Sequence, residues 1–170
     1  PTLKFDLLGA QLEACKEIGV KAPVYISAGF DEKDFRKHPE WHCVVSPDKE
    51  RQKEYENEVH FHLLCFNTAY LDVLCKQIEE VIVKYNPCGI FLDIISPKIC
   101  YCEKCKSDMK ALGLNIENED DREKFSQIVF NKYLEATNAA VRKHSVTATI
   151  FHNQGHIPKG DYRYIEKNSH

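Results

Sequence analysis

The chain has 170 residues, of which 43% are hydrophobic, enough for one substantial core. Its formal net charge of -3 gives no electrostatic reason to expect a nucleic acid or an anionic membrane as a partner. The sequence has no apolar run of about 18 residues, so it predicts no membrane span.

The first half of the chain predicts a helix, a strand and a long connection. Apolar residues spaced by three and four positions predict an amphipathic helix over residues 4–18, ended by Gly19. Residues 23–27 (Pro-Val-Tyr-Ile-Ser) predict a short buried strand. Residues 30–62 form a charged connection, and loops of this length are usually functional or contain small elements of their own.

The second half predicts three further helices and two strands. An uninterrupted apolar stripe follows Asn67-Thr68, which we expect to cap a helix that ends at Asn86-Pro87; its members are Leu71, Leu74, Cys75, Ile78, Val81, Ile82 and Tyr85. The further elements are strand 89–93, a short helix over 103–112, a long helix from the acidic stretch 117–123 to about residue 144, and strand 147–151.

Helices alternate with short apolar strands, which is typical of an α/β protein with a parallel sheet and right-handed crossovers. Three strands are too few for a closed (β/α)8 barrel, so any such barrel is only partly contained in this chain. The opening residues Pro1-Thr2-Leu3-Lys4 carry no signal peptide, and we expect the chain to begin inside a domain.

Three cysteines, Cys100, Cys102 and Cys105, lie within six residues. This spacing favours tetrahedral zinc, which needs one further ligand. Four thiolates leave no open position, so the zinc would be structural. The candidates for the fourth ligand are Cys65, Cys43, Cys88, His60 and His62.

The other cysteines and the histidines have simpler interpretations. Metal ligation in a reducing compartment explains the cysteines better than a disulfide framework does. We therefore expect a cytoplasmic protein. Cys15 and Cys75 lie on apolar helix faces and are expected to be buried, unligated thiols. We expect the histidines of the long connection to face solvent: His38, His42, His60 and His62.

Polar residues follow each predicted strand, and the carboxyl ends of parallel strands converge on one face, where ligands bind. Asp93 ends an otherwise apolar strand, and an unused carboxylate there would be costly. Trp41 is either a platform that stacks on a sugar or a plug for its own loop. We expect one cleft around Asp93, lined by Tyr25, Trp41, Asn67, His152, Asn153 and His156.

The sequence resembles two known families, one through its cysteine layout and the other along nearly the whole chain. Cys65-Phe-Asn-Thr-Ala-Tyr70, which lies 35 residues before Cys100, resembles the zinc-binding layout of glycoside hydrolase family 42 β-galactosidases. The family called hypothetical glycosyl hydrolase 6 is more similar still, through residues 23–27, 38–41, 64–67, 89–93, 100–102 and 151–156. The resemblance implies that residues 1–170 are one segment of a TIM-barrel sugar-hydrolase domain, roughly its second to fifth βα units. It also implies a zinc site at Cys65, Cys100, Cys102 and Cys105.

The catalytic assignment departs from family 42, whose catalytic Glu would fall at Ile95. Asp93 instead resembles in placement the nucleophile of family 29 α-L-fucosidases, which implies a retaining glycoside hydrolase acting on a carbohydrate, with its acid/base elsewhere. The alternatives are a non-catalytic carbohydrate-binding barrel and a scaffold domain that zinc stabilises. The sugar, the linkage and any homo-oligomer stay open.

Overall fold

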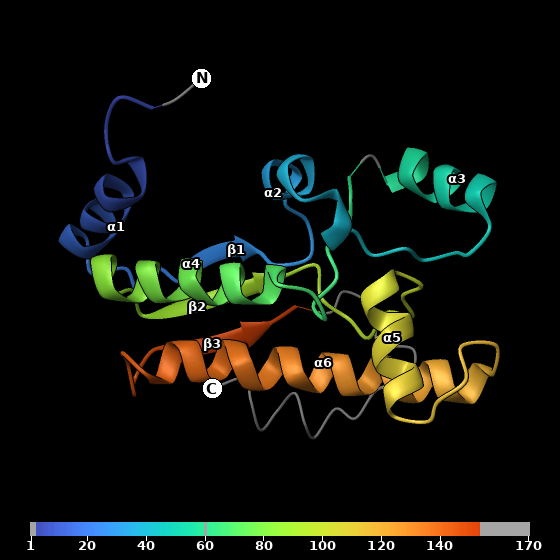
Figure 1. The fold of residues 1–170 in the computed structure, drawn as a ribbon. Helices are drawn as coiled ribbons and strands as arrows, with labels where there is room; N and C mark the ends of the chain where they lie inside the picture. The colour runs from blue at the N-terminus through green and yellow to red at the C-terminus, as the bar shows by residue number, and fades with distance from the viewer. Residues whose placement is uncertain (1–2, 60, 154–170) are drawn as a thin grey trace.

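Three short strands form one parallel sheet whose order follows the chain (Figure 1). The structure is a computed structural model that describes residues 3–59 and 61–153. The strands are β1 (Val24–Ser27), β2 (Gly89–Asp93) and β3 (Thr149–His152). Ile90 of the middle strand pairs with Val24 on one side and Ile150 on the other. The predicted parallel α/β architecture is confirmed.

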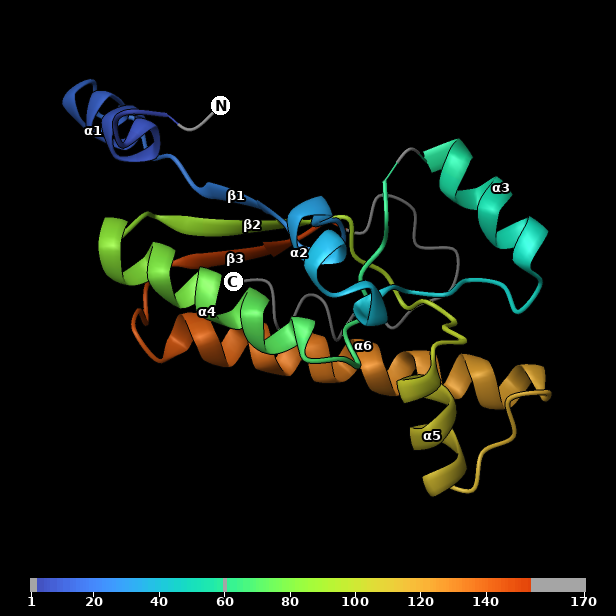
Figure 2. The ribbon, with the colours of Figure 1, turned by 45° about the horizontal axis from the view of Figure 1, so that its top comes forward.

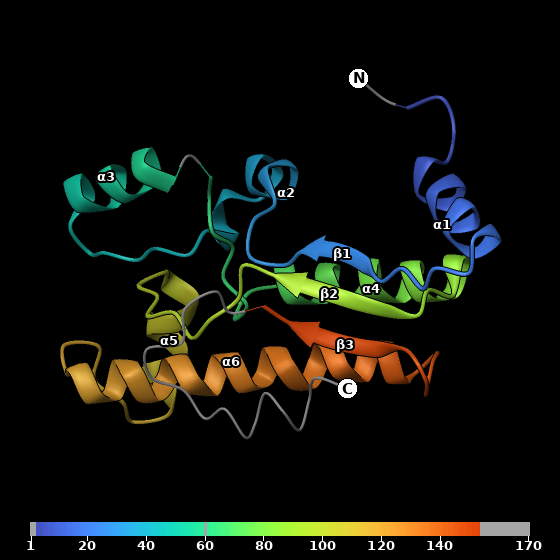
Figure 3. The same cartoon turned by 180° about the vertical axis from the view of Figure 1, so that it is seen from behind.

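Two helices, α4 (Tyr70–Tyr85) and α6 (Glu119–Arg142), cover one face of the sheet, as Figure 3 shows from behind. The buried side of α4 carries the predicted stripe, including Leu74 and Ile78, which are fully buried. These side chains share one core with Ile90 and Leu92 of β2. Asn86 then ends α4 in the left-handed conformation that suits a residue after a helix.

The opposite face of the sheet carries a row of aromatic side chains. The rings of Tyr25 and Phe91 lie 5.8 Å apart, and those of Phe91 and Phe151 lie 4.8 Å apart. Tyr25 is 56% exposed and Phe151 is 51% exposed. In the part of the chain that the structure describes, no helix covers this face (Figures 1 and 3).

The long connection contains three helical elements, α2 (Glu32–Lys37), the 3-10 helix η1 (Pro39–Trp41) and α3 (Lys49–Val59). His62 stacks on Phe35 with 3.7 Å between ring centroids, and His42 meets the edge of the same ring. The prediction that these two histidines face solvent is therefore wrong. Burial lowers the pKa of His42. His60 lies outside the described residues.

Helix α1 (Leu7–Glu17) forms as predicted and is capped by Asp6, but it lies at the edge of the sheet (Figure 2). Only Leu8 and Leu12 pack against the core, and α1 has no fully buried residue. Cys15 is consequently half-buried, and so is Cys75 on α4. Both were expected to be buried. They are less buried than expected, because an apolar stripe predicts a buried face but not how much of that face another element covers.

No helix among the described residues is both long enough and apolar enough to cross a membrane.

Candidate functional site at the end of the middle strand

Asp93 is the last residue of the central strand, and three donors converge on its carboxylate. The Tyr25 hydroxyl donates to Oδ2 at 2.9 Å, and the Asn153 amide donates to Oδ1 at 2.7 Å. The backbone N–H of Ile94 donates to Oδ1 at 2.8 Å. Asp93 and Asn153 follow Phe91 and Phe151 at the two-residue period of strands, so they share the uncovered face. Neighbouring strands therefore hold this carboxylate in one orientation.

Tyr25 keeps its proton as the donor in this arrangement. Partial desolvation, followed by the hydrogen bond and the charge of Asp93, raises the pKa of Tyr25. The hydroxyl therefore remains protonated at neutral pH and is a fixed donor to the carboxylate.

A second cluster consists of the thiols of Cys65, Cys100, Cys102 and Cys105. Their four Sγ atoms lie within 4.8 Å of one another, and all four residues are buried. The Sγ of Cys65 lies 3.5 Å from that of Cys105 and 3.9 Å from that of Cys102. A tetrahedron with Zn–S bonds of about 2.3 Å has edges of about 3.8 Å. These four cysteines are positioned to hold a metal ion.

Two features of the surrounding chain favour negative sulfur at this site. Helix α5 (Glu103–Ala111) begins at the cluster, with Cys102 as its N-cap residue and Cys105 in its first turn. The positive end of a helix dipole stabilises thiolates. The Asn67 amide donates to Cys105 Sγ at 3.8 Å and to the Asp108 carboxylate at 2.9 Å. Asn67 is thereby held against the sulfur cluster.

The charge distribution of the cluster calls for a cation. Hydrogen bonds from the thiols of Cys102, Cys105, Cys43 and Cys65 lower the pKa of Cys100. Hydrogen bonds with Cys100, Cys102 and Cys105 raise the pKa of Cys65 in turn. Sulfurs this close cannot all be ionised unless a positive charge lies among them. A metal ion held among the four sulfurs would supply that charge.

The other candidates for the fourth ligand lie elsewhere. Cys43 is buried beside Cys100 but is not one of the four mutually close sulfurs. Cys88 lies beyond the opposite end of the sheet, where its carbonyl accepts from Thr149. His62 bonds to Glu32 at 2.9 Å instead.

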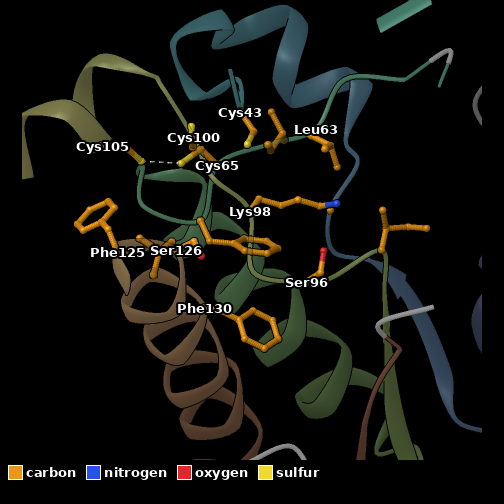
Figure 4. A pocket seen from close by; sticks show the side chains of 15 residues that line it. Cys43, Leu63, Cys65, Ser96, Lys98, Cys100, Cys105, Phe125, Ser126 and Phe130 are labelled. Carbon is orange, nitrogen blue, oxygen red and sulfur yellow. Dashed lines mark hydrogen bonds between the residues drawn. The ribbon is translucent and has the colours of Figure 1, made fainter. Parts of the chain in front are cut away.

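A hollow separates the thiol cluster from the end of β2 (Figure 4). Ser96 and Lys98 line it from the segment that leaves Asp93, and Phe125 and Phe130 line it from α6. The chain thus runs from Asp93 along this hollow to Cys100. The carboxylate site and the cysteine site therefore lie at the two ends of one short segment, residues 93–100.

The structure brings Tyr25 and Asn153 to Asp93, but it places three other predicted cleft residues elsewhere. Trp41 stacks on His38 with 3.8 Å between ring centroids, and it lines a groove that Asp93 does not line.

Asn67 and His152 also point away from the expected cleft. Asn67 contacts the cysteine site. The prediction that Asn67-Thr68 caps α4 is wrong, because the N-cap residue is Ala69, although the Thr68 hydroxyl accepts from Tyr70 N–H. His152 is buried on the helix side of the sheet, 3.3 Å from the Tyr133 hydroxyl, because strand residues alternate between faces. His156 lies outside the described residues.

The fold and its two sites define a parallel α/β protein with a carboxylate at the end of its middle strand and a buried tetrathiol cluster. The model of the family described as hypothetical glycosyl hydrolase 6 matches residues 1–94, and the chain belongs to that family. No curated protein sequence matches the chain.

Among solved structures, the chain is similar to α-L-fucosidase isoenzyme 2 from Paenibacillus thiaminolyticus, with 36% identity and a TM-score of 0.85. The match covers 99% of this chain and 26% of that one, so the chain spans about a quarter of the fucosidase.

Proposed function

We propose that this chain is the nucleophile-bearing part of a retaining glycoside hydrolase, with Asp93 attacking the anomeric carbon to form a glycosyl-enzyme. One observation carries the proposal: a carboxylate at the carboxyl end of the middle strand, fixed by Tyr25, Asn153 and the Ile94 N–H. Covalent catalysis needs a nucleophile that is held in a fixed orientation toward the carbon it attacks. The family membership and the fucosidase relative support a fucoside-like substrate.

The same proposal gives the uncovered face of the sheet a role. Residues 1–170 would form one segment of a (β/α)8 barrel, roughly its second to fifth βα units, with the aromatic row of Tyr25, Phe91 and Phe151 inside the barrel. The repeating unit of that fold is a strand followed by a helix on the outside of the barrel, and three parallel strands with helices on one face fit a segment of it. The general acid/base would come from outside this chain, with its carboxyl about 5–5.5 Å from Asp93.

A retaining mechanism predicts the anomer of the first product. The full-length enzyme would be mixed with an aryl α-L-fucoside and followed by proton NMR from the first seconds. We expect α-L-fucose to appear before mutarotation produces the β anomer, because two inversions restore the starting configuration. Initial release of the β anomer would rule out Asp93 as a nucleophile, since an inverting enzyme forms no covalent intermediate.

We further propose that the metal at the cysteine cluster is zinc and that its role is structural. Zinc bound by four thiolates has no open position for a water or a substrate, so it supplies no Lewis acid to the reaction. It would join the segment before α4 to the start of α5. Cys65 supplies one ligand from the first segment, and the other three come from residues 100–105.

Asn67 is expected to strengthen this site, because groups that bond to metal ligands commonly change metal affinity 10–100-fold. Asn67→Ala should lower zinc affinity by about 10-fold, measured by competition with a chromogenic chelator. Lys104→Ala is the matched control, because it removes a surface ion pair with Asp108 and leaves the Asn67–Cys105 contact in place. Equal affinity in the wild type and Asn67→Ala would contradict the role of this amide.

A further inference from the structure

The residue after Asp93 has an unusual backbone conformation. Ile94 adopts a φ of 60°, in the left-handed region. β-branched residues rarely occupy this region, because their Cβ substituents crowd the neighbouring carbonyls. Asn86 is the one other non-glycine residue with positive φ in the described part of the chain, and it ends a helix, where asparagine is well tolerated. The conformation of Ile94 has no such local explanation.

The backbone at Ile94 packs closely against Gly29. A Cβ added to Gly29 would lie 2.0 Å from the carbonyl oxygen of Ile94 and 2.9 Å from its Cγ2. The N–H groups of Ala28 and Gly29 both donate to the carbonyl of Asp93, at 3.0 and 3.3 Å. Gly29 therefore has no side chain because the backbone after Asp93 passes directly against it.

Gly29 is itself anchored from the other side. Its carbonyl accepts from Leu64 N–H at 3.0 Å, and Leu64 directly precedes the metal-site residue Cys65. The backbone at Asp93 and Ile94 is thus clamped to a segment that the cysteine cluster holds.

The left-handed turn determines what surrounds the carboxylate. It takes the chain away from the sheet directly after the Ile94 N–H, which itself donates to Oδ1 at 2.8 Å. The next N–H, of Ile95, donates to the carbonyl of Asn153 at 3.4 Å. Asn153 in turn donates its side-chain amide to the same Oδ1. The turn therefore connects the backbone after Asp93 to Asn153, one of the three donors.

We propose that Ile94, held in the left-handed conformation against Gly29, is a positioning residue that fixes the direction of the Asp93 carboxylate. The inference rests on the proposed role of Asp93 as the nucleophile. Ile94 touches no reacting atom in this account. It acts through the backbone, so its side-chain identity matters less than its conformation.

Two substitutions in the full-length enzyme separate backbone from side chain. Ile94→Asn keeps a Cβ and tolerates the left-handed region, whereas Ile94→Gly frees the backbone. We expect Ile94→Asn to retain kcat within about threefold. Ile94→Gly should keep its melting temperature within a few degrees but lose about 10–100-fold in kcat, with KM nearly unchanged, as expected for a misaimed catalytic group. Wild-type kcat in Ile94→Gly would overturn the proposal, and so would equal losses in the two variants.

Crystal structures of both variants provide a readout that does not depend on activity. The proposal predicts that the distance between Asn153 Nδ2 and Asp93 Oδ1, 2.7 Å in the parent chain, is kept in Ile94→Asn and lost or variable in Ile94→Gly. An unchanged carboxylate in Ile94→Gly overturns the positioning role. A displaced carboxylate supports it even if the wild-type enzyme hydrolyses no fucoside, which would refute the proposed function alone.

Discussion

Replacing Asp93 with alanine is expected to lower the kcat/KM of the full-length enzyme for an aryl fucoside by about 10³–10⁵-fold, because no glycosyl-enzyme can form without the carboxylate. The fold should survive, since Asp93 is only partly buried and its three donors can turn to water. Initial rates, circular dichroism and metal content measured on the same preparation would separate chemistry from folding.

Two further substitutions sharpen this prediction. Asp93→Gly opens space at the strand end, and added azide should restore turnover and give a fucosyl azide. Asp72→Asn removes an exposed carboxylate from the first turn of α4 and should keep full activity. Full activity in Asp93→Asn would show that this carboxylate is not the nucleophile, and a carbohydrate-binding barrel would then be the better account.

Loss of one cysteine ligand is expected to have the second large effect. Cys100→Ala should lower the bound zinc from about one per chain to none. It should also lower the free energy of unfolding by more than about 3 kcal/mol, because metal binding at such sites contributes directly to folding. Removing zinc from the wild type with a strong chelator should have a comparable effect on the melting temperature.

Cys43 provides the matched control for this experiment. It is as buried as Cys100 and lies beside it, but it is not among the four mutually close sulfurs. Cys43→Ala should keep the zinc and lose only the roughly 1–2 kcal/mol of an ordinary buried truncation. Equal loss of zinc in the two variants would contradict the assignment of the ligands.

The regular elements could be predicted because their patterns are local. The stripe from Leu71 to Tyr85 fixes a helix by its own spacing, and strand 89–93 was predicted with its exact bounds. The spacing of the three thiols at 100–105 predicts a metal site, and the structure places four buried cysteines where they could hold an ion. Spacing does not identify the fourth cysteine, because Cys43 and Cys65 are both buried near these three. The family resemblance implies Cys65, and the fold places it with the other three.

The side chains around Asp93 were harder to predict, because the direction in which each one points depends on the sheet and on loops far away in sequence. Tyr25 and Asn153 reach the carboxylate from neighbouring strands, as expected. His152 is one position from Asn153 yet faces the helices, and a register uncertain by one residue reverses the two. Nothing in the sequence predicts the left-handed conformation of Ile94 or its close contact with Gly29.

A covalent trap tests the central claim most directly. The full-length enzyme would be incubated with a 2-deoxy-2-fluoro fucosyl fluoride, whose fluorine slows hydrolysis of a glycosyl-enzyme, then digested and mapped by mass spectrometry. We expect one added fluorofucosyl group per chain, on the peptide that contains Gly89–Asp93 and attached to Asp93. A label on any other carboxylate, or turnover of the reagent with retention and no label on Asp93, would contradict it.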